Sequence, residues 1–170
     1  LPNPNGDFLI GIERHYSKNN RQDSLILINE NLKNKRILFE NITISHYCFI
    51  SRYKLLLWGN LEPENFGYYL CEISENFKIK NHEFIISIND GHPYYLKNNK
   101  VITEIPCGKG YTDFGFRIVE LDIEKKKITK LIGYVSHPHL VKKELRCDTH
   151  ISLEINKGII QLDICLLYTS

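Results

Sequence analysis

The chain has 170 residues, of which 42% are hydrophobic and 25% charged, and this composition is that of a globular protein with enough apolar residues for a core. A formal net charge of +2 is too small to indicate a nucleic-acid-binding protein, and no apolar run approaches the roughly 20 residues of a membrane-spanning helix. The five cysteines form no C-x-x-C pair and lie mostly in or beside apolar runs, so we expect reduced thiols and a cytoplasmic location.

Short runs of β-branched, aliphatic and aromatic residues follow one another along the chain, and no segment has helical periodicity. These runs predict an all-β protein. The expected strands are 8–13, 24–29, 36–40, 44–50, 54–59, 67–73, 83–88, 92–96, 100–105, 115–123, 128–134, 150–155 and 159–164. Longer polar loops are expected at 60–65, 106–113 and 136–144, where they would carry binding specificity on a rigid scaffold.

Three histidines each open the same short pattern of apolar or aromatic residues, a turn, and a second apolar run that begins nine residues after the histidine. These histidines are His46, His92 and His150, and they recur after 46 and then 58 residues. The second runs begin at Leu55, Val101 and Ile159, and the three segments align without a gap. Strand-turn-strand units repeated at such intervals are typical of β-propeller blades. The sequence therefore predicts a run of blades.

We expect residues 1–164 to be part of a single β-propeller domain, with about three to four blades of antiparallel four-stranded sheets. The fragment is expected to be incomplete at both ends. Residues 4–10 match the turn and second strand of the repeat, and the corresponding histidine would precede residue 1. Residues 165–170 read Cys-Leu-Leu-Tyr-Thr-Ser and resemble a translated sequencing-library adapter, which predicts a non-native tail.

Four segments carry a resemblance to a known family. They are Ser45-His46-Tyr47, Asp90-Gly91-His92-Pro93, Ile102-Thr103-Glu104 and Arg146-Cys147-Asp148-Thr149-His150. Through them the chain resembles a bacterial β-propeller family of largely uncharacterised proteins, whose propeller is similar to that of the oligogalacturonate lyases. The corresponding stretches of that family commonly read S-H-Y, D-G-H-P, I-T-D-T and R-C-D-L-H-P. Here Glu104 stands where Asp is usual, and Ile151 follows His150 where Pro is common.

In a propeller the first strand of each blade lines the central axis, so His46, His92 and His150 would face one channel. Neutral imidazole is a common ligand of divalent metals, which makes the three histidines candidate ligands for Mn²⁺ or a similar ion. The resemblance implies an acidic sugar or oligosaccharide as the ligand of the channel, and a lyase-like β-elimination of uronates. In that reaction a histidine-held metal stabilises the charge that develops when a base removes the proton α to the carboxylate.

Further residues are candidates for contact with this ligand. Arg146 can pair with a substrate carboxylate through two hydrogen bonds, and Asp148 can orient His150, so Arg146 and Asp148 are candidate catalytic residues. The candidate substrate-binding residues are Tyr47, Tyr94 and Glu104.

A structural alternative is open for most of these residues. Repeated histidines in propellers also form hydrogen bonds that connect one blade to the next, and Arg146 with Asp148 can form an interblade salt bridge. The alternative function is that of a non-catalytic propeller, which scaffolds protein-protein or glycan-assembly interactions through its faces. A histidine cluster with a separate base in one pocket favours the lyase, whereas a channel filled with apolar side chains favours the scaffold.

Overall fold

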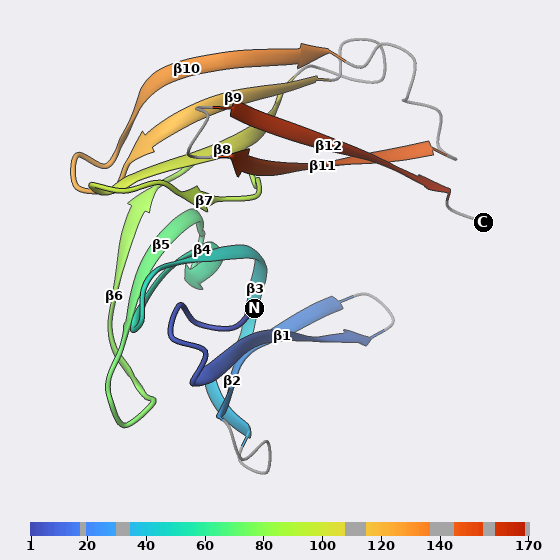
Figure 1. The fold of residues 1–170 in the computed structure, drawn as a ribbon. Coiled ribbons are helices and arrows are strands. Elements are labelled where there is room, and N and C mark those ends of the chain that lie inside the picture. Colours follow the sequence, from blue (N-terminus) through green and yellow to red (C-terminus); the bar gives the residue numbers. More distant parts are fainter. Residues whose placement is uncertain (18–19, 30–34, 108–114, 137–144, 155–158, 169–170) are drawn as a thin grey trace. The chain divides into compact units, whose positions relative to one another are not determined.

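A computed structural model of the protein describes residues 1–17, 20–29, 35–107, 115–136, 145–154 and 159–168. Every regular element in this part of the chain is a β-strand, which confirms the predicted all-β class (Figure 1). The chain divides into two compact units, Leu1–Ile88 and Asn89–Ser170. Within the described residues, no helix is long and apolar enough to cross a membrane.

The first unit is a six-stranded antiparallel sheet in which each strand pairs with the next one along the chain. Its strands are β1 (Phe8–Ser17), β2 (Asn20–Asn29), β3 (Lys35–Ser51), β4 (Lys54–Glu62), β5 (Asn65–Ile73) and β6 (Ile79–Ile86). Short connections between consecutive strands produce this up-and-down order. Two separate strands were expected at 36–40 and 44–50. That expectation was wrong, because both belong to the single long strand β3.

Strand β3 changes its partner along its length. Residues 35–42 pair with β2, whereas residues 43–51 pair with β4. At the change lies Asn41, whose φ of 58° is a left-handed conformation that Asn tolerates better than most residues. The register between β2 and β3 also shifts here, between the pairs Asp23–Ile42 and Leu25–Phe39. This local irregularity allows the single strand β3 to pair with β2 in its first part and with β4 in its second part.

The buried carboxylate of Asp23 holds β2 to β3 at this point. Its Oδ2 accepts a hydrogen bond of 2.9 Å from the backbone N–H of Ile44 and one of 2.6 Å from Nη2 of Arg21. The same Arg21 nitrogen donates to the Ile44 carbonyl oxygen at 2.6 Å. Burial raises the pKa of Asp23, but the bonds from Arg21 and Ile44 outweigh it and leave the pKa below its ordinary value.

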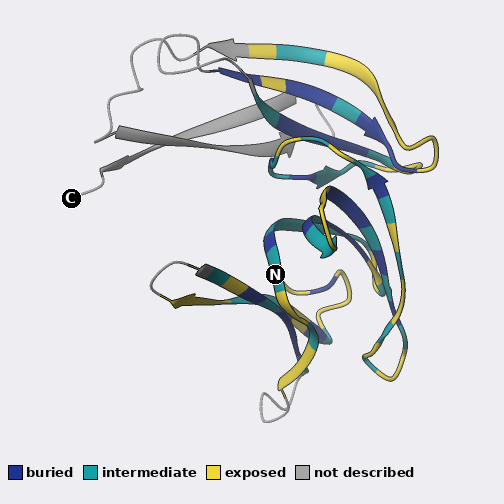
Figure 2. Cartoon of the chain, turned by 180° about the vertical axis from the view of Figure 1, so that it is seen from behind, coloured by how far each residue is buried: buried dark blue, intermediate teal, exposed yellow. Residues whose placement is uncertain are grey.

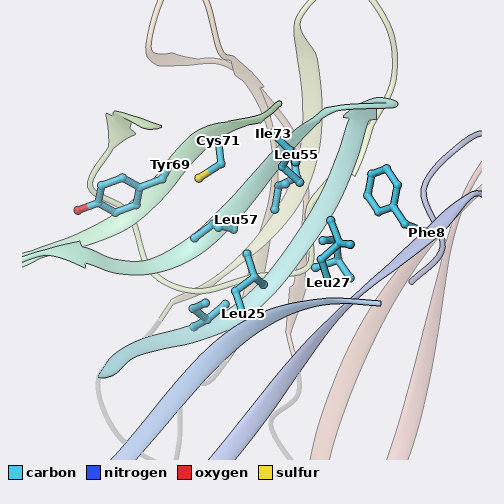
Figure 3. Packing of buried hydrophobic residues seen from close by; sticks show 10 residues of the cluster. Phe8, Leu25, Leu27, Leu55, Leu57, Tyr69, Cys71 and Ile73 are labelled. Carbon is cyan, nitrogen blue, oxygen red and sulfur yellow. The ribbon is translucent and has the colours of Figure 1, made fainter. Parts of the chain in front are cut away.

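The apolar core of the first unit is built from alternate residues of several strands (Figure 3). Side chains two residues apart in a strand point to the same face of the sheet, so Leu55 and Leu57 of β4 enter the same core. Burial of one such leucine contributes about 1.5–3 kcal/mol. The buried members of this core are Phe8, Ile10, Leu25, Leu27, Ile44, Leu55, Leu57, Tyr69, Cys71 and Ile73.

The position of Cys71 in this core predicts a thiol that does not react in the folded protein. Burial raises the pKa of Cys71 to about 12, so almost no thiolate is present at pH 8. Iodoacetamide labelling followed by peptide mapping is expected to leave Cys71 unmodified in buffer and to modify it in urea. Cys48 of β3 is only half-buried and serves as the comparison. Equal labelling of the two thiols in buffer would contradict the packing described here.

The second unit contains a four-stranded antiparallel sheet in the order β10-β9-β8-β7 and a hairpin of β11 and β12. Its strands are β7 (Tyr94–Tyr95), β8 (Lys100–Cys107), β9 (Gly115–Asp122), β10 (Lys127–Ser136), β11 (Leu145–Glu154) and β12 (Ile159–Tyr168). Strand β9 is largely buried, whereas the edge strand β10 is largely exposed (Figure 2). Residues 165–168 continue β12, and their expected non-native origin stays a prediction.

The repeat found in the sequence corresponds to a hairpin, and its first two copies share one register. Phe49 pairs with Leu55, and Tyr95 pairs with Val101, so the third and ninth residues after the histidine face each other in both cases. In the third repeat the ninth residue, Ile159, pairs with Glu154 instead, a shift of one position. Each of the first two hairpins continues into two further antiparallel strands, β5 and β6 or β9 and β10.

The loop expected at 60–65 is instead a tight turn. Glu62 pairs with Asn65, which leaves only Pro63 and Glu64 between β4 and β5. Proline is favoured at the first central position of such a turn, and Glu64 has a φ of 66° at the second. The prediction failed because the polar residues Asn60 and Glu62 still pair with neighbouring strands, Asn60 with Thr43 of β3 and Glu62 with Asn65 of β5. Most of the other two expected loops, namely residues 108–113 and 137–144, lies outside the described residues.

Candidate functional site

The second unit holds a histidine that is fixed by a buried carboxylate. Glu104, on β8, has a side chain that is only 2% exposed, and its Oε1 accepts a hydrogen bond of 2.8 Å from the backbone N–H of His92. The ring nitrogen Nδ1 of His92 contacts the same oxygen. A carboxylate accepts hydrogen bonds, so in a neutral ring this contact favours the proton on Nδ1 and the lone pair on Nε2. The His92 side chain is 20% exposed, so solvent reaches this otherwise buried pair.

A close approach of two backbone segments creates this arrangement. A Cβ atom at Gly91 would lie 1.7 Å from the backbone oxygen of Glu104 and 2.7 Å from Oγ1 of Thr103. Real Cβ atoms are never found so close to a backbone oxygen, so only glycine allows the segment before β7 to lie against β8. On the other side of His92, Pro93 restricts the backbone further. The sequence Gly91-His92-Pro93 therefore fixes the backbone from which the imidazole projects toward Glu104.

The second oxygen of Glu104 is buried and has no hydrogen-bond partner among the described residues. An unsatisfied buried polar atom costs about 1–3 kcal/mol, and more when the group is charged. Such an atom in a native protein calls for a physical explanation, such as a role in catalysis or binding. A carboxylate beside an imidazole, with one oxygen still to be satisfied, is suited to hold a proton or a cation.

The pairing of His92 with Glu104 is not a general property of the repeat. Twelve residues after the repeat histidine, the first repeat has Trp58 and the third has Leu162, whereas only the second has a carboxylate. In the first repeat Nδ1 of His46 instead lies 3.0 Å from Oγ of the adjacent Ser45. A histidine with a purely structural role in every repeat would be expected to keep the same partner. The difference singles out the second repeat.

Two predicted substrate-binding tyrosines lie on the first strands of the repeat hairpins. The hydroxyl of Tyr47, on β3, donates to the carbonyl oxygen of Ile10 at 2.5 Å and accepts from the amino group of Leu1 at 2.8 Å. Burial raises the pKa of Tyr47 to about 12. Tyr94 lies on β7 and is half-buried. The Tyr47 hydroxyl is therefore used within the first unit, and a substrate contact of either tyrosine stays a prediction.

The remaining candidates lie on β11. Arg146, Asp148 and His150 occupy alternate positions of this strand, and their backbones pair with Leu167, Cys165 and Asp163 of β12. Their side chains are outside the described part of the structure. The predicted roles of Arg146 and Asp148 therefore stay predictions.

The predicted metal ligands belong to different units, with His46 in the first and His92 and His150 in the second. Among the residues whose side chains are described, no group of three or more His, Cys, Asp or Glu residues is arranged to hold a metal. Of the six candidate histidines, tyrosines and glutamate, the described residues bring together two, His92 and Glu104. The shared three-histidine site stays a prediction. The sequence analysis did not predict that His92 and Glu104 contact each other. The residue twelve positions after each repeat histidine was a usable signal, because it is a carboxylate only in the second repeat.

Comparison with known proteins adds no further assignment. No protein-family model matches the chain, and no curated protein or solved structure matches it. The geometry around His92 is therefore the main basis for a functional proposal.

Proposed function

We propose that the chain is part of a carbohydrate-related β-propeller whose central channel binds an acidic sugar or oligosaccharide. Two features support the propeller. The repeat hairpins built on His46 and His92 share one register, and each continues into two more antiparallel strands, which is the composition of a propeller blade. The carbohydrate part of the proposal comes from the resemblance to the family that is similar to the oligogalacturonate lyases.

The His92–Glu104 pair is the observation that carries the proposed site. Histidines that ligate metals almost always donate their other ring N–H to a carboxylate, a carbonyl or a water, which fixes the tautomer and raises the basicity of the ligating nitrogen. Glu104 meets this requirement at Nδ1 of His92 and leaves the lone pair on Nε2. The unsatisfied oxygen of Glu104 also suits a nearby positive charge. We propose that His92 contributes Nε2 to a divalent cation such as Mn²⁺, with the histidines of the other repeats as further ligands.

The chemistry expected of this site is β-elimination from a uronate. A bound divalent cation supplies positive charge next to the substrate carboxylate. Glu104 keeps the His92 ring in one orientation, and Arg146 is proposed to pair with the same carboxylate. A base then removes the proton α to the carboxylate, a carbon-carbon double bond forms, and the C4 oxygen leaves with its electron pair. Asp148 is proposed to orient His150 on β11.

Metal and ligand binding by matched variants tests the proposal. Wild-type protein is expected to hold a stoichiometric divalent metal in elemental analysis and to bind an oligogalacturonate in calorimetry. His92→Ala is expected to lose the metal. Glu104→Gln is expected to lower the metal affinity by about 10- to 100-fold, because the substitution removes the charge that orients the His92 ring. His82→Ala, on β6 of the other unit, is the matched control and is expected to keep wild-type binding. Circular dichroism establishes that each variant is folded.

A non-catalytic scaffold is the second candidate, and the exposed edge strand β10 favours it. Leu131 and Tyr134 of this strand are 61% and 55% exposed, and Ile128 is 40% exposed. Exposed apolar residues that gather on one strand often mark a surface for a protein partner. A scaffold needs no ligand at His92. Wild-type protein without bound metal and without affinity for oligogalacturonate would therefore overturn the first proposal in favour of this one.

A further inference from the structure

One face of the hairpin formed by β1 and β2 changes from apolar to basic along its length. Ile10 of β1 and Leu25 of β2 are on this face and are buried in the core of the first unit. Side chains two residues apart in a strand share a face, so the face continues toward the tip with Arg14 and Tyr16 of β1 and Arg21 of β2. The tip projects beyond β4, β5 and β6 (Figure 1), and Tyr16 is 73% exposed there. The basic end of the face is therefore accessible to a ligand.

Both arginines of this face contact β3 just before the first repeat histidine. Nη2 of Arg21 donates a hydrogen bond of 2.6 Å to the carbonyl oxygen of Ile44. Nη2 of Arg14 donates one of 3.4 Å to the carbonyl oxygen of Ser45, and His46 is the next residue of the strand. Two positive charges, carried by separate strands, are therefore placed beside one of the repeat histidines.

The positive charge at this end of the hairpin is only partly neutralised. Residues 14–23 contain three basic residues and a single acidic one, Asp23, which leaves a formal charge of +2. Asp23 is buried and bound by Arg21, whereas the exposed Arg14 uses one of its five N–H donors in the bond to β3. Glu13 alternates with Arg14 and so lies on the opposite face. An anion is therefore attracted here, and the planar guanidinium of Arg14 can bind a carboxylate through two parallel hydrogen bonds.

We infer that Arg14 and Tyr16 form a subsite for one uronate residue of an acidic oligosaccharide, with Arg14 on the carboxylate and Tyr16 against the sugar ring. A guanidinium and an exposed aromatic ring two residues apart on one face suit a ligand that carries its carboxylate on a ring. The class of ligand rests on the proposed function, and the subsite deepens it, because it lies in the first unit and requires neither His92 nor a metal. Nucleic acid is disfavoured, since its phosphates need a longer row of cations than one hairpin provides.

Calorimetric titration with trigalacturonate in the presence of EDTA tests this subsite apart from the proposed metal site. Wild-type protein is expected to show saturable binding that weakens as the salt concentration rises. Galactotriose has similar sugar rings without carboxylates and is expected not to bind. Arg14→Gln is expected to lower the affinity for trigalacturonate about tenfold, because it removes the charged hydrogen bonds to the carboxylate. Tyr16→Ala is expected to lower it about 2- to 10-fold, because the surface against the sugar ring is lost.

Three control variants make the outcome decisive. Arg14→Lys keeps the charge without the planar fork and is expected to fold with intermediate affinity, which separates loss of the contact from loss of folding. Arg36→Gln removes another exposed arginine of the same unit and is expected to keep wild-type affinity, which separates a local site from net charge. His92→Ala is expected to bind trigalacturonate normally in EDTA, so failure of the proposed function and failure of this inference are distinguishable. Absence of binding in EDTA, an unchanged affinity in Arg14→Gln, an equal loss in Arg36→Gln, or tighter binding of single-stranded DNA would overturn the inference.

Discussion

Replacement of Asp23 by alanine is expected to lower the free energy of unfolding by about 3–4 kcal/mol. The variant leaves the guanidinium of Arg21 and the backbone N–H of Ile44 without the carboxylate to which both now donate. The buried N–H of Ile44 would lose its partner, which costs about 1–3 kcal/mol, and loss of the charged bonds from Arg21, whose side chain is 34% exposed, adds to this. A domain of this size is stabilised by about 5–15 kcal/mol in total, so the expected loss is a large fraction of the stability. Urea denaturation followed by circular dichroism measures the difference.

The contribution of Asp23 is also expected to depend on pH. Its pKa in the folded protein lies below the ordinary value of an aspartate in the unfolded chain, about 3.9. Its contribution is therefore complete above that value and is lost as the pH falls through the lower, folded pKa. The stability difference between wild type and Asp23→Asn is expected to be constant near neutral pH and to shrink in acid. A difference that grows in acid would contradict this sign.

Glu72 provides the matched control for Asp23. Its carboxylate pairs with Lys80 at 3.0 Å, but this pair is on the surface, with the Lys80 side chain 64% exposed. Exposed pairs contribute about 0–1 kcal/mol, so Glu72→Ala is expected to have a small effect. Equal effects of the two alanine substitutions would show that burial of Asp23 has no energetic consequence.

Replacement of Gly91 by alanine is expected to have the second largest effect, a destabilisation of about 3 kcal/mol. The added methyl group would meet the backbone oxygen of Glu104 at 1.7 Å, and a strand backbone moves away only if its hydrogen bonds are disturbed. The separation forced between this segment and β8 would also break the contacts of His92 with Glu104. The measurement is urea denaturation together with Mn²⁺ titration, and metal affinity is expected to fall as it does in His92→Ala.

Gly133→Ala is the control for this substitution. Gly133 lies on β10, and the atom nearest to an added Cβ is Cδ1 of Ile118 at 3.9 Å, an ordinary van der Waals distance. Alanine also loses less backbone entropy than glycine in a strand, so the variant is expected to be neutral or slightly stabilised. If Gly91→Ala were equally neutral, the close approach of the two backbones at the candidate site would be disproved.

The strands could be predicted from the sequence because apolar residues recur with the period of a pleated strand. The continuity of β3 could not be predicted, because Asn41 is typical of a turn, whereas here its left-handed backbone lies inside a strand, three residues before Ile44, to which Asp23 and Arg21 are hydrogen-bonded. These contacts join residues about twenty positions apart, and their spacing follows no periodic pattern.

The candidate site was predicted in part. His92 and Glu104 were each selected from the sequence, one as a metal ligand and the other as a substrate-binding residue. Their direct contact depends on how closely the segment before β7 approaches β8, which Gly91 permits but no local pattern encodes.

The partner change in β3 gives the chain a joint between two sets of strands. In repeat proteins each repeat contacts only its neighbours, and stability is approximately the sum of the contributions of the repeats and of the interfaces between them. Here residues 35–42 are hydrogen-bonded to β2 and residues 43–51 to β4. A cut or an insertion at Asn41 would therefore leave each set of strands with its own backbone pairing, and the contacts of Arg21 and Asp23 with Ile44 would still join the two sets. Duplication or exchange of strands in such a chain is compatible with a boundary at Asn41, just before the repeat that begins at His46.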